Sequence, residues 1–73
     1  MTKLKQILIK KKVMNKTLAE ETGLSLDMIA SLVQGRMKIE RTAIASVVKI
    51  ASALKVKVYE IIEDEEIAKY LRK

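Results

Sequence analysis

The chain has 73 residues, enough for one small domain, and its 49% hydrophobic residues argue against disorder. Cysteine and histidine are absent, which excludes disulfides, zinc fingers and the catalytic pairs built on these residues, and a chain without disulfides is typical of the cytoplasm. Fifteen basic residues against nine acidic ones give a net charge of +6, which favours a polyanionic partner, and the apolar runs are too short to span a membrane.

Helices are the expected structure, because two glycines and no proline leave few signals for turns. Residues 3–12 predict a first helix, in which apolar residues recur at helical spacing and lysines fill the other side. Its apolar residues are Leu4, Ile7 and Leu8. Residues 15–22 predict a short second helix whose buried face is Leu18 and Ala19. Gly23 then ends this helix, at a position suited to a left-handed backbone.

The third predicted helix begins after Ser25, which is a good N-cap, and Asp27 in its first turn complements the helix dipole. The apolar stripe of this helix consists of Ile29, Leu32 and Val33. Gly35 ends the helix, and residues 36–41 follow it as a polar, basic loop. A fourth helix is predicted from a cap at Thr42 to about Leu54. Its predicted apolar face consists of Ile44, Val47, Val48, Ala51 and Leu54.

Two short helical segments are predicted after the fourth helix. Residues 58–62 form the first of them, and its inward-facing residues are Ile61 and Ile62. A last turn or two begins near Asp64, with an apolar stripe that consists of Ile67, Tyr70 and Leu71. The predicted fold is therefore an all-α bundle of about five short helices. Its main domain would cover residues 1–62, and residues 63–73 would form a C-terminal helical extension, a candidate dimerisation segment.

Residues 15–34 fit the helix-turn-helix arrangement, in which two short helices are joined by a turn that contains glycine. Ala19 supplies the small side chain that is needed where the two helices cross closely. Gly23 allows the tight turn, and Leu24 closes that turn against the core. Many helical hairpins have alanine and glycine at similar places, so the sequence on either side of the motif is needed to support it.

With those flanks included, the chain resembles the lambda-repressor and Cro-like (XRE-type) helix-turn-helix domains, a family of phage and bacterial transcriptional regulators. The resemblance runs from Leu4 to Ile62. It is carried by Leu4–Lys5, Thr17–Glu20, Gly23–Ser25, Ile29–Leu32, Gly35 and Val48–Val56. It implies a compact bundle of five short helices, sequence-specific binding of double-stranded DNA and, usually, a homodimer on a palindromic operator.

The resemblance also implies which residues contact DNA. They are Asn15, Lys16, Leu26, Asp27, Met28, Ser31, Gln34, Arg36 and Lys38. Ser31 would contact a base and Gln34 a phosphate, and the alternative is that both lie on a solvated helix face. The start of the third helix departs from the family, which often has Gln, Ser, Arg or Asn there. In this chain Leu26 could touch a thymine methyl group, and Asp27 could accept a hydrogen bond from cytosine N4.

We therefore expect a sequence-specific transcriptional regulator that represses by occupying its operator as a homodimer, without enzyme activity, cofactor or metal. The homodimer would pair the C-terminal apolar stripes, and the alternative is that the stripe folds back onto its own domain. Two other functions stay open. One is a protein-interaction module of the same fold, such as an antitoxin, and the other is binding of RNA or of a membrane surface through the basic stretches.

Overall fold

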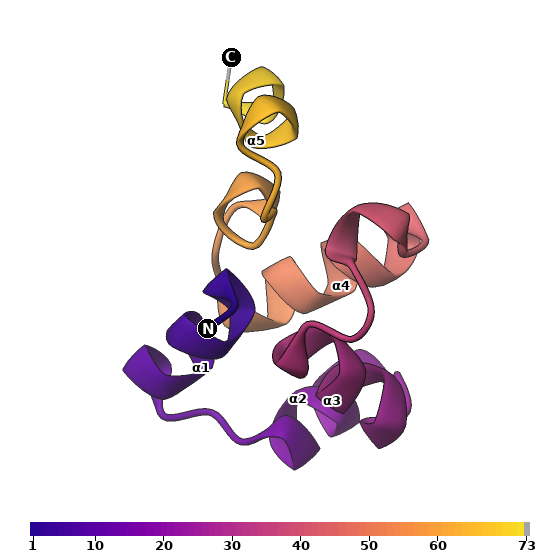
Figure 1. The fold of residues 1–73 in the computed structure, drawn as a ribbon. Helices are drawn as coiled ribbons and strands as arrows, with labels where there is room; N and C mark the ends of the chain where they lie inside the picture. Colours follow the sequence, from indigo (N-terminus) through magenta and orange to yellow (C-terminus); the bar gives the residue numbers. More distant parts are fainter. Residues whose placement is uncertain (73) are drawn as a thin grey trace.

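The structure is a computed structural model that describes residues 1–72, and Lys73 at the end of the predicted extension lies outside the described residues. Within residues 1–72 the chain forms helices and no strand, which confirms the predicted all-α fold with five α-helices (Figure 1). The elements in chain order are α1 (Lys3–Lys11), α2 (Asn15–Thr22), α3 (Leu26–Gln34), the 3-10 helix η1 (Ile39–Arg41), α4 (Ile44–Leu54), the 3-10 helix η2 (Val58–Glu60) and α5 (Glu65–Leu71).

Side-chain caps start three of the α-helices. The capping oxygens accept hydrogen bonds from amides in the first turns of α1, α3 and α5, and they belong to Thr2, Ser25 and Asp64. Apolar residues stand at the same position of α2 and α4, namely Met14 and Ala43. The prediction that Thr42 caps α4 is therefore wrong. Its hydroxyl donates instead to the carbonyl oxygen of Lys38, at 2.8 Å, and so closes the turn of η1.

The core is aliphatic, and every α-helix contributes to it. Its most deeply buried large side chains are Leu4, Leu18, Ile29, Leu32, Ile50 and Ile61. The predicted face of α4 is partly wrong, because Ile44 is 71% exposed and Val48 is exposed, whereas Ile50 is fully buried. Two overlapping apolar stripes at helical spacing exist on this helix, and the sequence pattern alone does not choose between them. The stripe that packs is Val47, Ile50, Ala51 and Leu54.

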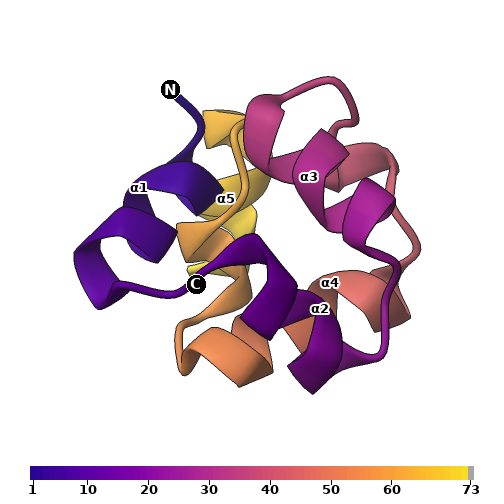
Figure 2. The ribbon, with the colours of Figure 1, turned by 90° about the horizontal axis from the view of Figure 1, so that it is seen from below.

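The helix-turn-helix lies at one end of the molecule and α5 at the other (Figure 1). Helix α2 packs against α3 and α4, while α1 packs against α3. Figure 2 views the molecule from the end where α2 and α3 lie. In this view α5 lies behind the first four α-helices. The long axis of the molecule measures 31 Å and the other two measure 22 Å. The α2–α3 end is therefore open to a large partner without interference from the C-terminal helix.

Helix α5 is held to the rest of the fold by one small buried side chain and by polar contacts. Ala68 is fully buried. The Lys3 ammonium lies 2.6 Å from the Glu65 carboxylate, and this hydrogen bond with its charge lowers the pKa of Glu65 below its ordinary value. The predicted apolar stripe of this segment, Ile67, Tyr70 and Leu71, is exposed. In this structure the stripe is therefore not buried against its own domain.

Candidate nucleic-acid interface

The turn between α2 and α3 fixes the position of α3. Gly23 has a φ of +75°, and its amide donates to the carbonyl oxygen of Ala19 at 2.9 Å. Thr22 is buried beside it, and its hydroxyl donates to the carbonyl oxygen of Leu18 at 2.8 Å. Threonine is thus suited to this position although it is less apolar than a core residue, because its polar atom is satisfied within the helix.

Helix α3 buries one side and exposes the other. Its buried residues are Ile29, Leu32 and Val33, as the sequence predicts. The side chains of Leu26, Asp27 and Gln34 are exposed. Ser31 is half-buried, and Met28 is half-buried against the core. The first turn of α3 therefore presents a leucine and a carboxylate to solvent, and the last turn presents an amide.

Gly35 ends α3 and redirects the chain into the basic loop of residues 36–41. Its φ is +84°, and the carbonyl oxygen of Ser31 accepts hydrogen bonds from the amides of Arg36, at 2.9 Å, and Met37, at 3.2 Å. The Arg36 guanidinium also lies 3.5 Å from the Ser31 hydroxyl. Two of the predicted DNA contacts, Ser31 and Arg36, are therefore neighbours on the surface.

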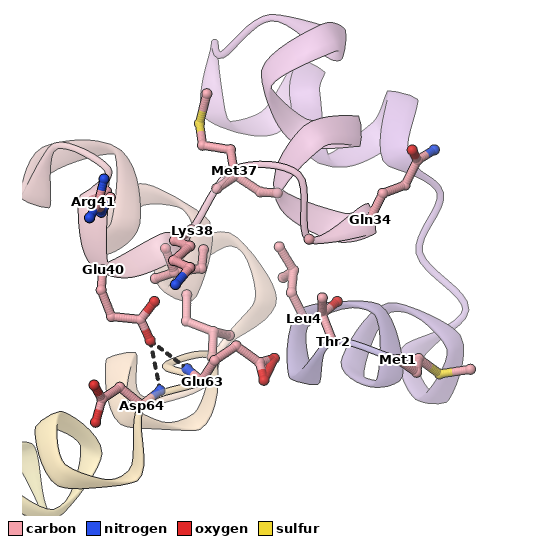
Figure 3. Close-up of a pocket in the computed structure, with 14 residues that line it drawn as sticks. Met1, Thr2, Leu4, Gln34, Met37, Lys38, Glu40, Arg41, Glu63 and Asp64 are labelled. Carbon is pink, nitrogen blue, oxygen red and sulfur yellow. Dashed lines mark hydrogen bonds between the residues drawn. The ribbon is translucent and has the colours of Figure 1, made fainter.

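The predicted basic loop of residues 36–41 is not irregular throughout, because Ile39–Arg41 forms the 3-10 helix η1. Ile39 is buried, so it anchors the loop in the core. Glu40 ties the other side of the loop to the chain before α5: one carboxylate oxygen accepts hydrogen bonds of 2.8 Å from the amides of Glu63 and Asp64 (Figure 3). The side chains of Arg36 and Lys38 remain exposed on a loop that is held at both of its ends.

Neither anchor of the loop, Ile39 or Glu40, was predicted from the sequence. Ile39 carried a signal, since it is a single aliphatic residue among polar ones, and such a residue in a short loop often packs inward. Glu40 carried no such signal, because its partners lie 23 and 24 positions further along the chain. The same loop borders a cavity of about 670 Å³ between the start of α1 and the chain before α5, which Gln34, Lys38 and Arg41 help to line (Figure 3).

The start of α2 provides a second basic position. Met14 occupies its N-cap with an apolar side chain, which leaves the first amides of the helix available to an acceptor from outside. Lys16 is exposed and Asn15 is half-buried in this first turn. A phosphate group could accept hydrogen bonds from these amides, and its negative charge would suit both the helix N-terminus and Lys16. Positive charge thus stands at the start of α2 and in the loop after α3, on either side of the exposed surface of α3.

The predicted contact residues do not all line one surface feature. Four of them line one groove beside α1, namely Asn15, Lys16, Leu26 and Gln34. Ser31 and Arg36 form the neighbouring pair described above, and Lys38 lines the cavity on the other side of Gln34. Asp27 and Met28 line neither the groove nor the cavity. The groove also brings in residues that the prediction omitted, including Lys5, Lys12 and Met14.

Two further properties of the described chain bear on the kind of site. Within residues 1–72, no helix is long and apolar enough to cross a membrane. The same part of the chain holds no group of three or more acidic side chains arranged to bind a metal ion. Three neighbouring carboxylates are instead engaged with other groups: that of Asp64 caps α5, and those of Glu63 and Glu65 accept hydrogen bonds from Lys3.

A comparison with protein families identifies the family of the chain. The family described as the Cro/C1-type HTH DNA-binding domain matches residues 3–66, which is most of the chain. Searches of curated proteins and of solved structures found no match. The family match covers α1 to α4 and the first residues of α5, and so includes the helix-turn-helix and both of its basic flanks.

Proposed function

Because the chain belongs to the Cro/C1-type helix-turn-helix DNA-binding domain family, we propose that it is a sequence-specific transcriptional regulator that represses by occupying its operator on double-stranded DNA. The supporting observation is the placement of α3. This helix buries Ile29, Leu32 and Val33 and exposes its other side between two basic positions at the open end of the molecule. A helix so placed can enter the major groove while the basic positions meet the phosphates.

Eight of the nine predicted contact residues then divide by role, and Met28, which is half-buried against the core, is assigned none. Phosphate contacts fall to the residues on either side of α3, namely Asn15, Lys16, Arg36 and Lys38, and to Gln34 at its end. Base contacts fall to the exposed residues of α3 itself. Leu26 is suited to a thymine methyl group, and Asp27 to the amino group of cytosine. Ser31 lies beside Arg36, so a base contact made by Ser31 would adjoin the phosphate contact made by Arg36.

We also propose that the active form is a homodimer on a palindrome, with residues 1–62 as the DNA-binding unit and residues 63–73 as the dimerisation extension. A single α3 makes few base contacts, and a symmetric pair doubles them. The exposed side chains of Ile67, Tyr70 and Leu71 favour this interface, since a symmetric pair of α5 helices would cover them. Helix α5 lies at the end opposite to α3 (Figure 1), so such a dimer leaves both recognition helices uncovered.

Salt dependence tests the phosphate contacts. Affinity for a mixed-sequence duplex is measured at several salt concentrations on the parent, on Arg36→Gln and on Lys38→Gln, with Lys69→Gln on α5 as the matched control. Each loop variant is expected to weaken binding to all sequences and to flatten the salt slope by about one unit, because one fewer counterion is released. A slope that stays the same in both loop variants would remove the loop from the interface.

Mass measurement over a concentration series tests the dimer. The parent is expected to pass from the 8.3 kDa monomer to twice that mass as its concentration rises, and Leu71→Asp is expected to stay monomeric. Ile44→Asp is the matched control, because Ile44 is also an exposed aliphatic residue and lies on a different helix, α4. A parent that is monomeric at all concentrations contradicts the dimer, and dissociation by Ile44→Asp alone would move the interface to α4.

A further inference from the structure

Three exposed apolar side chains from different elements meet at one groove. Ile9 on α1 is 58% exposed, Met14 before α2 is 69% exposed and Leu26 at the start of α3 is 50% exposed. The groove that they line has a volume of about 820 Å³, and the buried residues Leu8 and Val33 contribute to it. Apolar side chains gathered in this way on a small domain mark a binding surface more often than isolated exposed ones do.

The border of this groove is basic. Lys5, Lys12 and Lys16 line it, and among the described residues that form it there is no aspartate or glutamate. The whole of residues 1–16 carries six lysines and no acidic residue. The first amides of α2 receive no side-chain cap from Met14, so they are available to an acceptor from outside. The occupant of the groove must therefore supply apolar surface and negative charge together.

A DNA backbone meets only the second of these requirements. Phosphates would pair with the lysines, but the apolar side chains of Ile9 and Met14 would then face charged groups. Apolar surface that is covered by charged groups gives no hydrophobic stabilisation. An amphipathic helix meets both requirements, because it carries apolar side chains on one face and carboxylates on the flanks of that face. We propose that the groove binds one acidic amphipathic helix of a protein partner, whose apolar face covers Ile9, Met14 and Leu26.

Such a partner would compete with DNA. Asn15, Lys16, Leu26 and Gln34 line the groove and are also among the proposed DNA contacts. The helix and the operator therefore cannot occupy these residues together, so the partner would release the regulator from DNA. This consequence rests on the proposed function, whereas the binding of the helix to the groove does not.

The test uses a fluorescent synthetic peptide of about 18 residues with leucines at helical spacing and glutamates elsewhere. One control peptide has lysine in place of every glutamate, and another has serine in place of every leucine. The acidic amphipathic peptide is expected to bind the intact chain, and both controls are expected to bind much more weakly. Equal binding of the lysine peptide, or of the serine peptide, would overturn the proposal.

Variants of the protein locate the site. Met14→Ser removes apolar surface while it supplies the side-chain N-cap that Met14 does not give α2, so the helix is preserved, and it is expected to weaken peptide binding about 10-fold. Lys5→Gln is expected to weaken it about threefold at low salt. The matched controls are Ile44→Ser and Lys49→Gln, which change exposed residues of α4 outside the groove. Binding that is lost equally in the control pair, or retained in Met14→Ser, would contradict the proposed groove.

Competition separates this proposal from the proposed function. The peptide is added to the protein bound to a duplex that has been selected from a random pool, and release of the duplex is expected. Peptide binding without any selected duplex would uphold the groove and contradict DNA recognition. A selected duplex without peptide binding would do the reverse. Simultaneous binding of both ligands would overturn the competition.

Discussion

The hydroxyl of Thr2 donates a hydrogen bond of 2.7 Å to the carbonyl oxygen of Val33, a residue 31 positions away. The Thr2 hydroxyl oxygen also accepts a hydrogen bond of 3.0 Å from the amide of Lys5, which makes Thr2 the N-cap of α1. One side chain thus starts the first helix and holds the last turn of α3. The orientation of the proposed recognition helix therefore depends on a residue at the beginning of the chain.

Replacement of Thr2 tests this connection. Thr2→Val removes the cap and the bond to Val33 while it keeps the shape, and it is expected to lower the free energy of unfolding by about 1–3 kcal/mol. Thr2→Ser keeps both bonds and is expected to stay close to the parent. Denaturant unfolding followed by circular dichroism measures the difference. Equal stability of the valine and serine variants would show that the hydroxyl contributes nothing.

The two glycines offer a matched pair of substitutions. Both have positive φ, so Gly23→Ala and Gly35→Ala each place a side chain in a left-handed conformation that costs about 1–2 kcal/mol. A methyl group at Gly35 would also lie 3.3 Å from the Thr2 methyl carbon, whereas at Gly23 it would meet no atom of the described chain within 4 Å. Gly35→Ala is therefore expected to be the more destabilising of the two in thermal unfolding, and the opposite order would contradict the packing of Thr2 on Gly35.

The packing face of α4 can be tested with two isoleucines. Ile50→Ala is expected to lower the free energy of unfolding by about 2–5 kcal/mol, because it leaves a cavity at a fully buried position. Ile44→Ala is expected to change it by less than about 0.5 kcal/mol, because that side chain is mostly exposed. Chemical denaturation of both variants under the same conditions gives the comparison. A larger loss for Ile44→Ala would mean that α4 is rotated about its axis.

The contact between Lys3 and Glu65 predicts a pH effect. Because this contact lowers the pKa of Glu65 in the folded protein, its contribution to stability is present above the ordinary pKa of the carboxyl group and is lost as the pH falls through the lowered value. An NMR titration of the Glu65 side chain should therefore have a midpoint below the ordinary value. In Lys3→Met the midpoint should rise, and an unchanged midpoint would exclude Lys3 as the cause.

Local sequence signals predicted most of the helices and their ends. The N-cap at Ser25 and the glycines at positions 23 and 35 act through bonds within a few residues, so the sequence contains everything that decides them. Predictions were wrong where tertiary packing decides. Ile44 and Ile50 both fit an apolar stripe of α4, and only contact with the rest of the core selects Ile50.

The candidate site divides in the same way. The buried side of α3 followed from its apolar spacing, so the exposed positions of Leu26, Asp27 and Gln34 could be predicted with it. The groove beside α3 could not be predicted, because it joins residues of α1, such as Ile9, to the start of α3. The contact of Glu40 with the chain before α5 is equally nonlocal. Sequence patterns report faces of single helices and not the surfaces that several helices share.

Selection of bound duplexes from a random pool tests the central claim, that α3 and its basic flanks recognise a specific DNA sequence. The intact chain is used beside a variant in which Arg36 and Lys38 are both replaced by glutamine. We predict that the parent enriches a palindrome whose half-sites lie about one helical turn apart, and that the variant enriches little or nothing at the same salt concentration. A parent that enriches no sequence over the starting pool would contradict the account.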